Sequence, residues 1–210
     1  MNGKIGHTHI LMDVRARHAV PLRYNTHMEL IDIGANLGHE SFDQDLPEVL
    51  ARARAAGVVQ MVITGASREG SPRALQIAQQ NPHFLYATAG VHPHHAVEYT
   101  QECDREMRAL HQHTEVIAVG ECGLDYFRDL APRPAQRKAF EQQLQLAADL
   151  QKPLFLHQRD AHDDFLAMMK NFDGQLGKAV VHCFTGTKKE LYACLDADFY
   201  IGITGWLCDE

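Results

Sequence analysis

The 210-residue sequence predicts an α/β fold of the (β/α)8-barrel type, and three observations lead to this class. Short apolar runs alternate with amphipathic segments from residue 29 onward, the pattern of strands buried on both faces and joined by helices. The runs follow one another at roughly 20–35 residues, as βα units require. Polar and titratable residues follow four successive runs, at the edge where the loops of a barrel converge on one site.

Seven apolar runs, many of them rich in β-branched residues, are the expected strands. An open doubly wound sheet has the same alternation, so the strand count alone does not separate it from a barrel. The segment after the first run, Gly34–Gly38, lacks the glycine spacing of a dinucleotide-binding loop. The expected strands are Leu30–Ala35, Val58–Thr64, Phe84–Gly90, Val116–Glu121, Pro153–His157, Ala179–His182 and Tyr200–Thr204.

Helices are expected between these runs, and several carry recognisable start signals. Asp45 precedes a proline at an early helical position, Pro47, and Ser71 stands directly before Pro72, as residues that cap a helix do. Ala135–Leu150 has an apolar stripe at three- to four-residue spacing, which predicts a helix that faces the core. Thr187 and Glu190 have the spacing of a capping box.

Composition excludes several classes of protein. Apolar residues make up 45% and charged residues 22% of the chain, as in globular domains and unlike disordered or fibrous ones. A membrane-spanning run of about 18 apolar residues is absent from the sequence. The net charge of −7 argues against binding of nucleic acid by a broad basic surface. Five scattered cysteines without a CxxC pair suit reduced thiols, so a cytoplasmic protein is expected.

Two parts of the chain shape the expected domain organisation. Residues 1–27 hold four basic residues and one acidic residue without a sustained period, and a second methionine, Met28, precedes the first expected strand. We therefore expect residues 1–27 to be a disordered extension or an artefact of start-site choice, and residues 28–210 to form the barrel. Because the sequence ends soon after the seventh run, we expect a barrel truncated after its seventh strand, with unpaired edges on the first and last strands.

The strand ends carry the candidate chemistry. His92 and His94 follow the third run, Glu121 ends the fourth, His157 ends the fifth and His182 ends the sixth. One such histidine is more often a hydrogen-bonded structural residue than a ligand. Several titratable groups at one edge are costly to bury together, and this grouping favours a metal site. A carboxylate with two imidazoles suits Zn²⁺, Mn²⁺, Co²⁺ or Mg²⁺.

These motifs resemble the TatD-like deoxyribonuclease family, within the amidohydrolase-type metal-dependent hydrolases. The resemblance covers residues 28–210 and implies a TIM barrel, a divalent metal ion, and hydrolysis of phosphodiester bonds in DNA or RNA from the 3′ end. The motifs that carry it are Gly90-Val91-His92-Pro93-His94, Gly120-Glu121-Cys122-Gly123-Leu124-Asp125, His157-Gln158-Arg159-Asp160-Ala161, His182-Cys183-Phe184-Thr185-Gly186 and Tyr200-Ile201-Gly202-Ile203-Thr204-Gly205.

The resemblance also implies roles for individual residues. Glu121, His157 and His182 match the family's metal ligands, with Mg²⁺ the first choice and Mn²⁺ or Zn²⁺ as alternatives. Glu121, Asp125 and Arg159 form the expected catalytic set, in which Arg159 meets a phosphate oxygen and Asp125 orients a ligand or water. The expected substrate-binding residues are His92, His94 and Asn36.

Two departures from the family pattern bear on this assignment. Most relatives begin the first strand with a metal-binding His-x-His pair, whereas this chain has Gly34 and Asn36 there, a substitution that the TatD branch shares. His7-Thr8-His9 has the right spacing but precedes the expected barrel, so it is not expected to bind metal. The family's eighth strand carries a Thr-Asp-(Ala/Ser)-Pro motif, and this sequence ends before such a motif.

The expected partner is therefore a single-stranded DNA or RNA end, bound by a monomer or weak oligomer without a membrane. Two alternatives remain. A hydrolase of the same scaffold could act on ester, amide or aminoacyl-tRNA bonds, because loops rather than fold decide the substrate. A truncated chain could also bind a metal or a partner without turnover.

Overall fold

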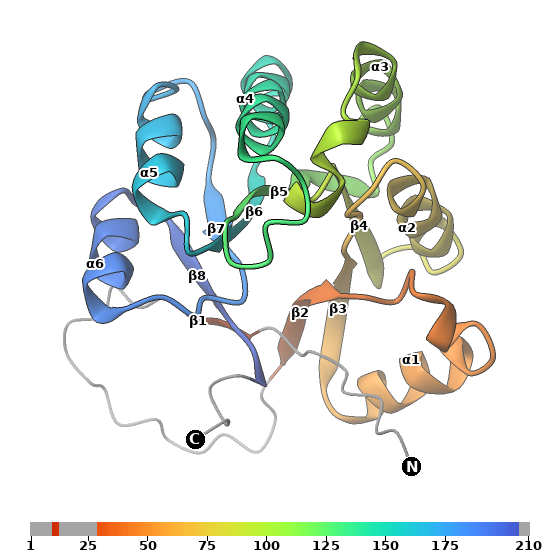
Figure 1. Cartoon of the computed structure of the whole chain (residues 1–210). Coiled ribbons are helices and arrows are strands. Elements are labelled where there is room, and N and C mark those ends of the chain that lie inside the picture. Colours follow the sequence, from red (N-terminus) through yellow and green to blue (C-terminus); the bar gives the residue numbers. More distant parts are fainter. Residues whose placement is uncertain (1–9, 13–28, 206–210) are drawn as a thin grey trace.

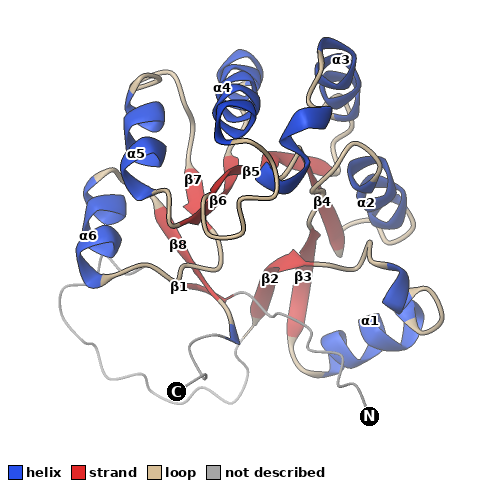
Figure 2. Cartoon of the chain, viewed as in Figure 1, coloured by secondary structure: helices blue, strands red, loops and turns tan. Residues whose placement is uncertain are grey.

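The computed structural model describes residues 10–12 and 29–205, whose strands form a closed barrel in chain order. Consecutive strands from β2 to β8 pair with one another in parallel. Helices lie outside these strands in an arc from α1 to α6 (Figures 1 and 2). The parallel strands are β2 (Leu30–Ala35), β3 (Val58–Ile63), β4 (Leu85–Ala89), β5 (Val116–Asp125), β6 (Leu154–Arg159), β7 (Ala179–Val181) and β8 (Tyr200–Ile203).

Each crossover between consecutive parallel strands contains a helix, as expected for βα units. Two short 3-10 helices, η1 and η2, lie in the loops after β2 and β4. None of the described helices combines the length and the apolar character needed to cross a lipid bilayer. The helices are η1 (Glu40–Phe42), α1 (Leu46–Ala55), α2 (Gly70–Gln79), η2 (Pro93–Glu98), α3 (Gln101–Leu110), α4 (Arg133–Leu150), α5 (His162–Lys170) and α6 (Lys188–Asp196).

A short antiparallel strand closes the barrel. Strand β1 (Ile10–Met12) pairs with β8 on one side, from Ile10 opposite Ile203 to Met12 opposite Ile201. On the other side Ile10 lies opposite Asp32 of β2. The expectation of unpaired edges on the first and last parallel strands therefore differs from the structure. A sheet edge presents unpaired N–H and C=O groups, and β1 provides partners for both edges.

Strand β1 also belongs to the segment expected to lie outside the fold. Residues 1–9 and 13–28, including His7-Thr8-His9, are outside the described part of the chain. The expectation of a disordered extension thus differs from the structure at Ile10–Met12, which belong to the sheet. Three residues are too few for a period of two to stand out in the sequence, and their partners lie far along the chain.

The seven expected strands are confirmed, and the main difference is the length of β5. This strand continues past Glu121 to Asp125, because Gly123, Leu124 and Asp125 pair with the end of β6. The extended backbone brings two carboxylates, Glu121 and Asp125, onto a single strand.

Helix signals gave a mixed outcome. The Thr187–Glu190 capping box is confirmed, with both of its hydrogen bonds present. The expectation that Ser71 caps a helix is wrong: α2 begins at Gly70, and the buried Ser71 hydroxyl donates to the carbonyl of Gly90 at 3.0 Å. The serine therefore links α2 to the loop after β4, rather than satisfying a helix end.

The core fills the barrel and the layer between strands and helices. Helix α4 contributes the fully buried Phe140, which stacks on Phe165 of α5 with ring centroids 5.6 Å apart. Phe165 in turn meets Phe199, the residue before β8, at 6.3 Å. Because this layer is closely packed, the carboxyl ends of the strands are held in fixed positions beneath their loops.

Candidate active site at the carboxyl ends of β4 to β7

Six titratable side chains gather at the carboxyl ends of four neighbouring strands. Their rings and carboxylates are buried or largely buried, with side-chain exposure between 0% and 21%. Strand β4 leads to the two histidines in the loop, β5 supplies both carboxylates, β6 supplies one histidine, and the residue after β7 supplies the last. The six residues are His92, His94, Glu121, Asp125, His157 and His182.

Glu121 is the centre of the first half of the cluster. Its Oε1 atom accepts a hydrogen bond from His157 Nδ1 at 3.0 Å and contacts His182 Nε2. His92 Nε2 lies 3.6 Å from the same oxygen. Three imidazoles from three different strands or loops therefore converge on one carboxylate oxygen.

Asp125 is the centre of the second half. Its Oδ2 atom accepts hydrogen bonds from His94 Nε2 at 2.9 Å and from His157 Nε2 at 3.2 Å. The Arg128 guanidinium lies at 3.2 Å from the same oxygen, and the backbone N–H of Arg128 donates to Oδ1 at 2.8 Å. His157 therefore bridges the two carboxylates through its two ring nitrogens.

The electrostatics of the cluster favour ionised carboxylates and a protonated His157. Burial tends to raise the pKa of Glu121, but the charge of His182 and hydrogen bonds from His157 and His182 outweigh it and hold that pKa well below its usual value. Burial likewise opposes ionisation of Asp125, yet hydrogen bonds from His157 and from the Arg128 backbone lower its pKa. Burial disfavours the charged form of His157, but hydrogen bonds to Asp125 and Glu121 raise its pKa to about 9.

His92 differs from His157 although the two rings lie only 4.3 Å apart. Burial lowers the pKa of His92 to about 3, and the attraction of Glu121 only partly offsets that effect. His92 is therefore neutral at physiological pH, and its Nδ1 accepts the backbone N–H of His94 at 3.1 Å. This bond fixes the tautomer so that Nε2 carries the remaining proton and faces Glu121.

The local sequence explains how two strands approach closely here. Gly120 and Gly123 have φ angles of +134° and +145°, which L side chains rarely adopt. A Cβ atom at Gly120 would lie 2.0 Å from the carbonyl oxygen of Phe155, and one at Gly123 would lie 1.9 Å from that of His157. Glycine at both positions is therefore what allows β5 to present its carboxylates beside β6.

Two buried glutamines of α4 hold the backbone beneath the cluster. Gln136 accepts the N–H of Asp125 at 2.9 Å and donates to its carbonyl at 3.1 Å. Gln143 makes the same pair of bonds with Val91, the residue before His92, at 2.7 and 3.0 Å. Sequence analysis missed these positioning residues. The available signal was their spacing of seven, which places two polar residues on the apolar face of α4.

The donor set fits a divalent cation. One ligand atom each from His92, Glu121 and His157 lie within 4.8 Å of one another, and the same holds for His92, His94 and Asp125. Two carboxylates and several imidazoles suit the ions expected from the sequence. The positive charge favoured on His157, between the two carboxylates, is the charge that a bound cation would supply.

Not every sequence-predicted site residue joins this cluster. Arg159 ends β6 and lies at the rim, with its guanidinium carbon 4.5 Å from the centre of the Phe127 ring. Asn36 is exposed in the loop after β2, where its carbonyl accepts the N–H of His39. Among the described residues, none of the hydrogen bonds of the cluster involves Asn36. The structure thus brings together every predicted site residue except Asn36 and places Arg159 at the edge.

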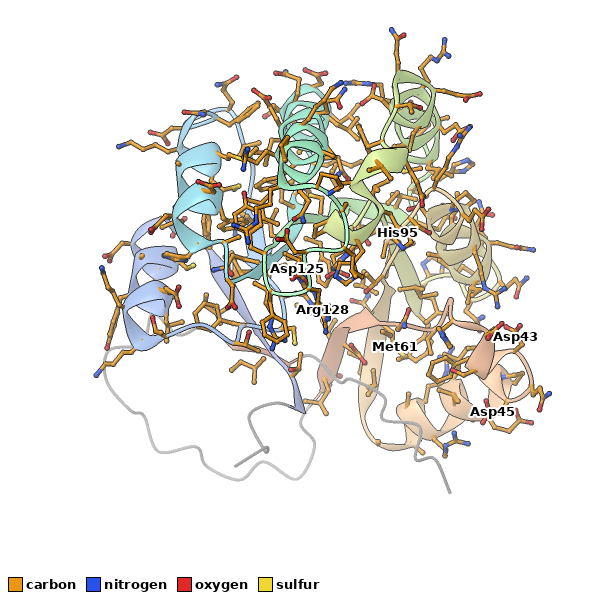
Figure 3. The ribbon with its side chains drawn as sticks, viewed as in Figure 1. Asp43, Asp45, Met61, His95, Asp125 and Arg128 are labelled. Atoms are coloured by element: carbon orange, nitrogen blue, oxygen red, sulfur yellow. The ribbon has the colours of Figure 1, made fainter. Side chains whose placement is uncertain are left out.

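Sequence analysis also missed the loop between β5 and α4. Phe127 and Arg128 lie two and three residues after Asp125, and Arg128 contacts its carboxylate. Figure 3 shows Asp125 and Arg128 together at this loop. The signal was their position two and three residues after a candidate catalytic aspartate, where side chains border the same site.

A β/α-barrel hydrolase, with its titratable groups at the carboxyl ends of the strands, is the class that this fold and site define. The family model described as TatD related DNase matches residues 31–210. The chain therefore belongs to the TatD-related DNase family, which places it among the hydrolases that act on ester bonds.

Two relatives in sequence carry the same name. The chain is 49% identical over 181 residues to a protein of Edwardsiella piscicida named 3'-5' ssDNA/RNA exonuclease TatD, covering 86% of this chain and 70% of that protein. It is 45% identical over 181 residues to the protein of the same name from Salmonella typhimurium, covering 86% of this chain and 69% of that protein.

Solved structures agree on the fold. A TatD family hydrolase from Entamoeba histolytica superposes with a TM-score of 0.73 at 28% identity, over 83% of this chain and 64% of that one. A TatD homologue from Escherichia coli K12 superposes with a TM-score of 0.74 at 30% identity, over 81% of this chain and 66% of that one. The chain thus spans just under two thirds of each of these two structures.

Proposed function

We propose that this protein is a metal-dependent nuclease that hydrolyses phosphodiester bonds at the 3′ ends of single-stranded DNA or RNA. The observation that carries the proposal is the convergence of His92, His157 and His182 on one oxygen of Glu121, beside the Asp125 carboxylate. The names of the relatives support the substrate and the direction of cleavage.

Glu121, His157 and His182 would hold the metal. A divalent cation bound there, with Mg²⁺ the first choice and Mn²⁺ or Zn²⁺ as alternatives, supplies Lewis acidity toward a phosphoryl oxygen. Glu121 is suited to this role because its pKa is lowered and its carboxylate stays ionised.

The remaining residues act on the ligands and on the substrate. Asp125 stays ionised, and its Oδ2 atom accepts the hydrogen bond of His157 Nε2 and so orients the imidazole of that ligand. His94 donates to Asp125 Oδ2 at 2.9 Å and so fixes the direction of that carboxylate. Arg159, at the rim, offsets the negative charge that builds on the phosphoryl oxygens as the water oxygen bonds to phosphorus.

The charge of the chain is consistent with binding at a strand end. A net charge of −7 does not favour a long phosphate-tracking surface, whereas an end held at one metal site needs few cations. We also place the protein in the cytoplasm as a monomer or weak oligomer. Cys103, Cys122, Cys183 and Cys194, the described cysteines, are all free thiols, as a reducing compartment favours.

The test is cleavage of a 5′-labelled single-stranded oligonucleotide with added Mg²⁺, Mn²⁺ or Zn²⁺, compared with EDTA. We expect progressive shortening of the labelled strand only with metal. Glu121→Gln should lower the rate at least about 100-fold, because it replaces the anionic oxygen that would hold the metal with a neutral amide of the same volume. Glu141→Gln makes the same change on the exposed face of α4 and should cleave as wild type.

Several results would contradict the proposal. One is shortening that continues in EDTA, and another is full activity in Glu121→Gln with an unchanged far-UV circular dichroism spectrum. Absence of strand shortening with every metal would favour the inactive alternative. Release of amino acid from an aminoacyl ester, without strand shortening, would favour the hydrolase alternative.

A further inference from the structure

The loop between β5 and α4 exposes two large apolar side chains beside the cluster. Phe127 is 60% exposed and Leu130 is 68% exposed. A single exposed apolar residue is common on protein surfaces and calls for no special role. Phe127 differs from Leu130 because the Arg159 guanidinium lies over its ring and its backbone N–H donates to Asp125.

Two guanidinium groups border the Phe127 ring and the cluster. The guanidinium carbon of Arg159 lies 4.5 Å from the ring centre, in a cation–π contact. Arg128, the next residue, contacts Asp125 Oδ2 at 3.2 Å. The loop thus lies beside the ends of β5 and β6.

The geometry leaves part of the ring open. A guanidinium centred over an aromatic ring covers one face, and an exposed fraction of 60% means that much of the remaining ring surface meets solvent. An open aromatic face next to cations matches the two parts of a nucleotide, a flat base and an anionic phosphate. Asp125, two residues earlier in the chain, places this surface beside the proposed reaction centre.

We propose that Phe127 is the stacking platform for a nucleobase next to the scissile phosphodiester of a single-stranded end, with Arg159 holding the ring and meeting the phosphate. This inference rests on the proposed nuclease function and adds how the substrate is held. A base in a duplex is already stacked and paired, whereas a base at a single-stranded end is free to stack on protein. Stacking on an aromatic ring is tolerant of sequence, because every base has a π face.

The experiment measures binding separately from cleavage. Fluorescence anisotropy in EDTA, where turnover is not expected, gives the affinity of a labelled oligothymidylate and of the same strand with abasic residues at its 3′ end. Phe127→Ala should weaken binding of the intact strand by about 5- to 100-fold, the loss typical of one base stacked on an aromatic side chain. Phe127→Trp should bind as tightly as wild type or more tightly, because the π face is kept.

Leu130→Ala is the matched control, since it removes an equally exposed apolar side chain without a π face from the same loop. It should leave the affinity unchanged. The abasic strand should bind wild type more weakly than the intact strand and should not distinguish wild type from Phe127→Ala. Melting temperatures of all variants should equal that of wild type, because neither side chain is buried.

The inference is overturned if Phe127→Ala binds the intact strand as wild type does, or loses the same factor on both strands. If binding in EDTA is too weak to measure, KM for strand shortening replaces it, and an unchanged KM in Phe127→Ala is contrary to the inference. The proposed function fails separately: a strand that binds through Phe127 but is not cleaved with any metal leaves the stacking role intact. If Phe127→Ala cleaves the strand and binds it with wild-type affinity, the stacking inference fails while the proposed nuclease function stands.

Discussion

The two sides of the barrel are built differently. From β4 to β7 each strand pairs with parallel neighbours, and the six titratable side chains of the candidate site all come from these strands and the loops at their carboxyl ends. On the opposite side the three-residue strand β1 lies antiparallel between β8 and β2. We call the first the site side and the second the seam, meaning β8, β1 and β2.

This difference teaches that barrel closure and the arrangement of the site can be separated. The side-chain hydrogen bonds of Glu121 and Asp125 lead to residues of the site side, and among the described residues none of them reaches the seam. Damage to packing on the site side should therefore change stability and activity together, whereas damage to the seam should change stability alone.

The largest effect is expected from Phe140→Ala, which removes a fully buried ring stacked on Phe165 beneath the site side. The free energy of unfolding should fall by about 3–5 kcal/mol, because lost burial and a cavity both contribute. Urea denaturation measures this change. Tyr192→Ala, an aromatic residue 54% exposed on α6, should change stability by less than about 0.5 kcal/mol. Equal effects of the two variants would mean that the Phe140 layer is not tightly packed.

A second effect concerns pH and His111, which caps the end of α3. Its Nε2–H donates to the carbonyl of Ala89 at 3.1 Å, while its buried Nδ1 has no partner among the described groups. Burial, helped by Lys152, lowers the pKa of His111 to about 4 from its usual 6.5. The folded state thus disfavours the proton that the unfolded state accepts.

This difference in the pKa of His111 between the folded and unfolded states decides how the free energy of unfolding changes with pH. Between about pH 6.5 and pH 4 the unfolded chain binds the proton and the folded chain does not, so the free energy of unfolding should fall with falling pH. The full loss is about 3 kcal/mol, and it does not grow below pH 4. Urea denaturation across this range checks it. His111→Gln keeps a neutral donor and should lose this part of the pH dependence, and an unchanged slope would contradict the assignment.

A smaller effect is expected at the seam. Leu11→Pro removes one backbone N–H from β1, opposite Gly202 of β8, and proline fits poorly in a strand with neighbours on both sides. We expect the free energy of unfolding to fall by about 1–3 kcal/mol, with little change in the cleavage rate at low temperature. Leu11→Ala keeps the backbone N–H and is the control for Leu11→Pro. A loss of cleavage in the folded Leu11→Pro variant would show that seam and site are coupled.

No effect is expected from His7→Ala and His9→Ala, singly or together. Both histidines lie outside the described residues, and the proposed ligands all come from the site side. The measurement is metal-dependent strand shortening beside Glu121→Gln. A loss of activity in the double variant would show that the segment before β1 contributes the histidine pair that β2 lacks, and the contrast between the two sides would no longer hold.

Much of the fold could be predicted because its signals are local. Continuous apolar runs marked all seven parallel strands, and the polar residues at their ends favoured the barrel over an open sheet. Helix α3 lies where a helix was expected between two runs, and its start at Thr100, whose hydroxyl accepts the N–H of Cys103, was not identified from the sequence. Strand β1 was missed because its evidence is long-range pairing rather than pattern.

The site was predictable for a different reason. Residues that follow consecutive parallel strands must meet at one edge, so topology alone brought His92, Glu121, His157 and His182 together. Asn36 was carried over from the family pattern, and among the described residues it is exposed and makes no hydrogen bond to the cluster. Phe127 was missed although it lies two residues after Asp125, because its proposed role depends on the guanidinium above its ring.

The paired glutamines of α4 have a mechanical consequence. Gln136 grips the backbone at Asp125, and Gln143 grips it at Val91, two helical turns further along the same rigid rod. If α4 shifts as a rigid body without rotating, both anchoring points move by the same amount in the same direction. The distance between the His92 imidazole and the Asp125 carboxylate is then preserved during such shifts of the outer helical layer.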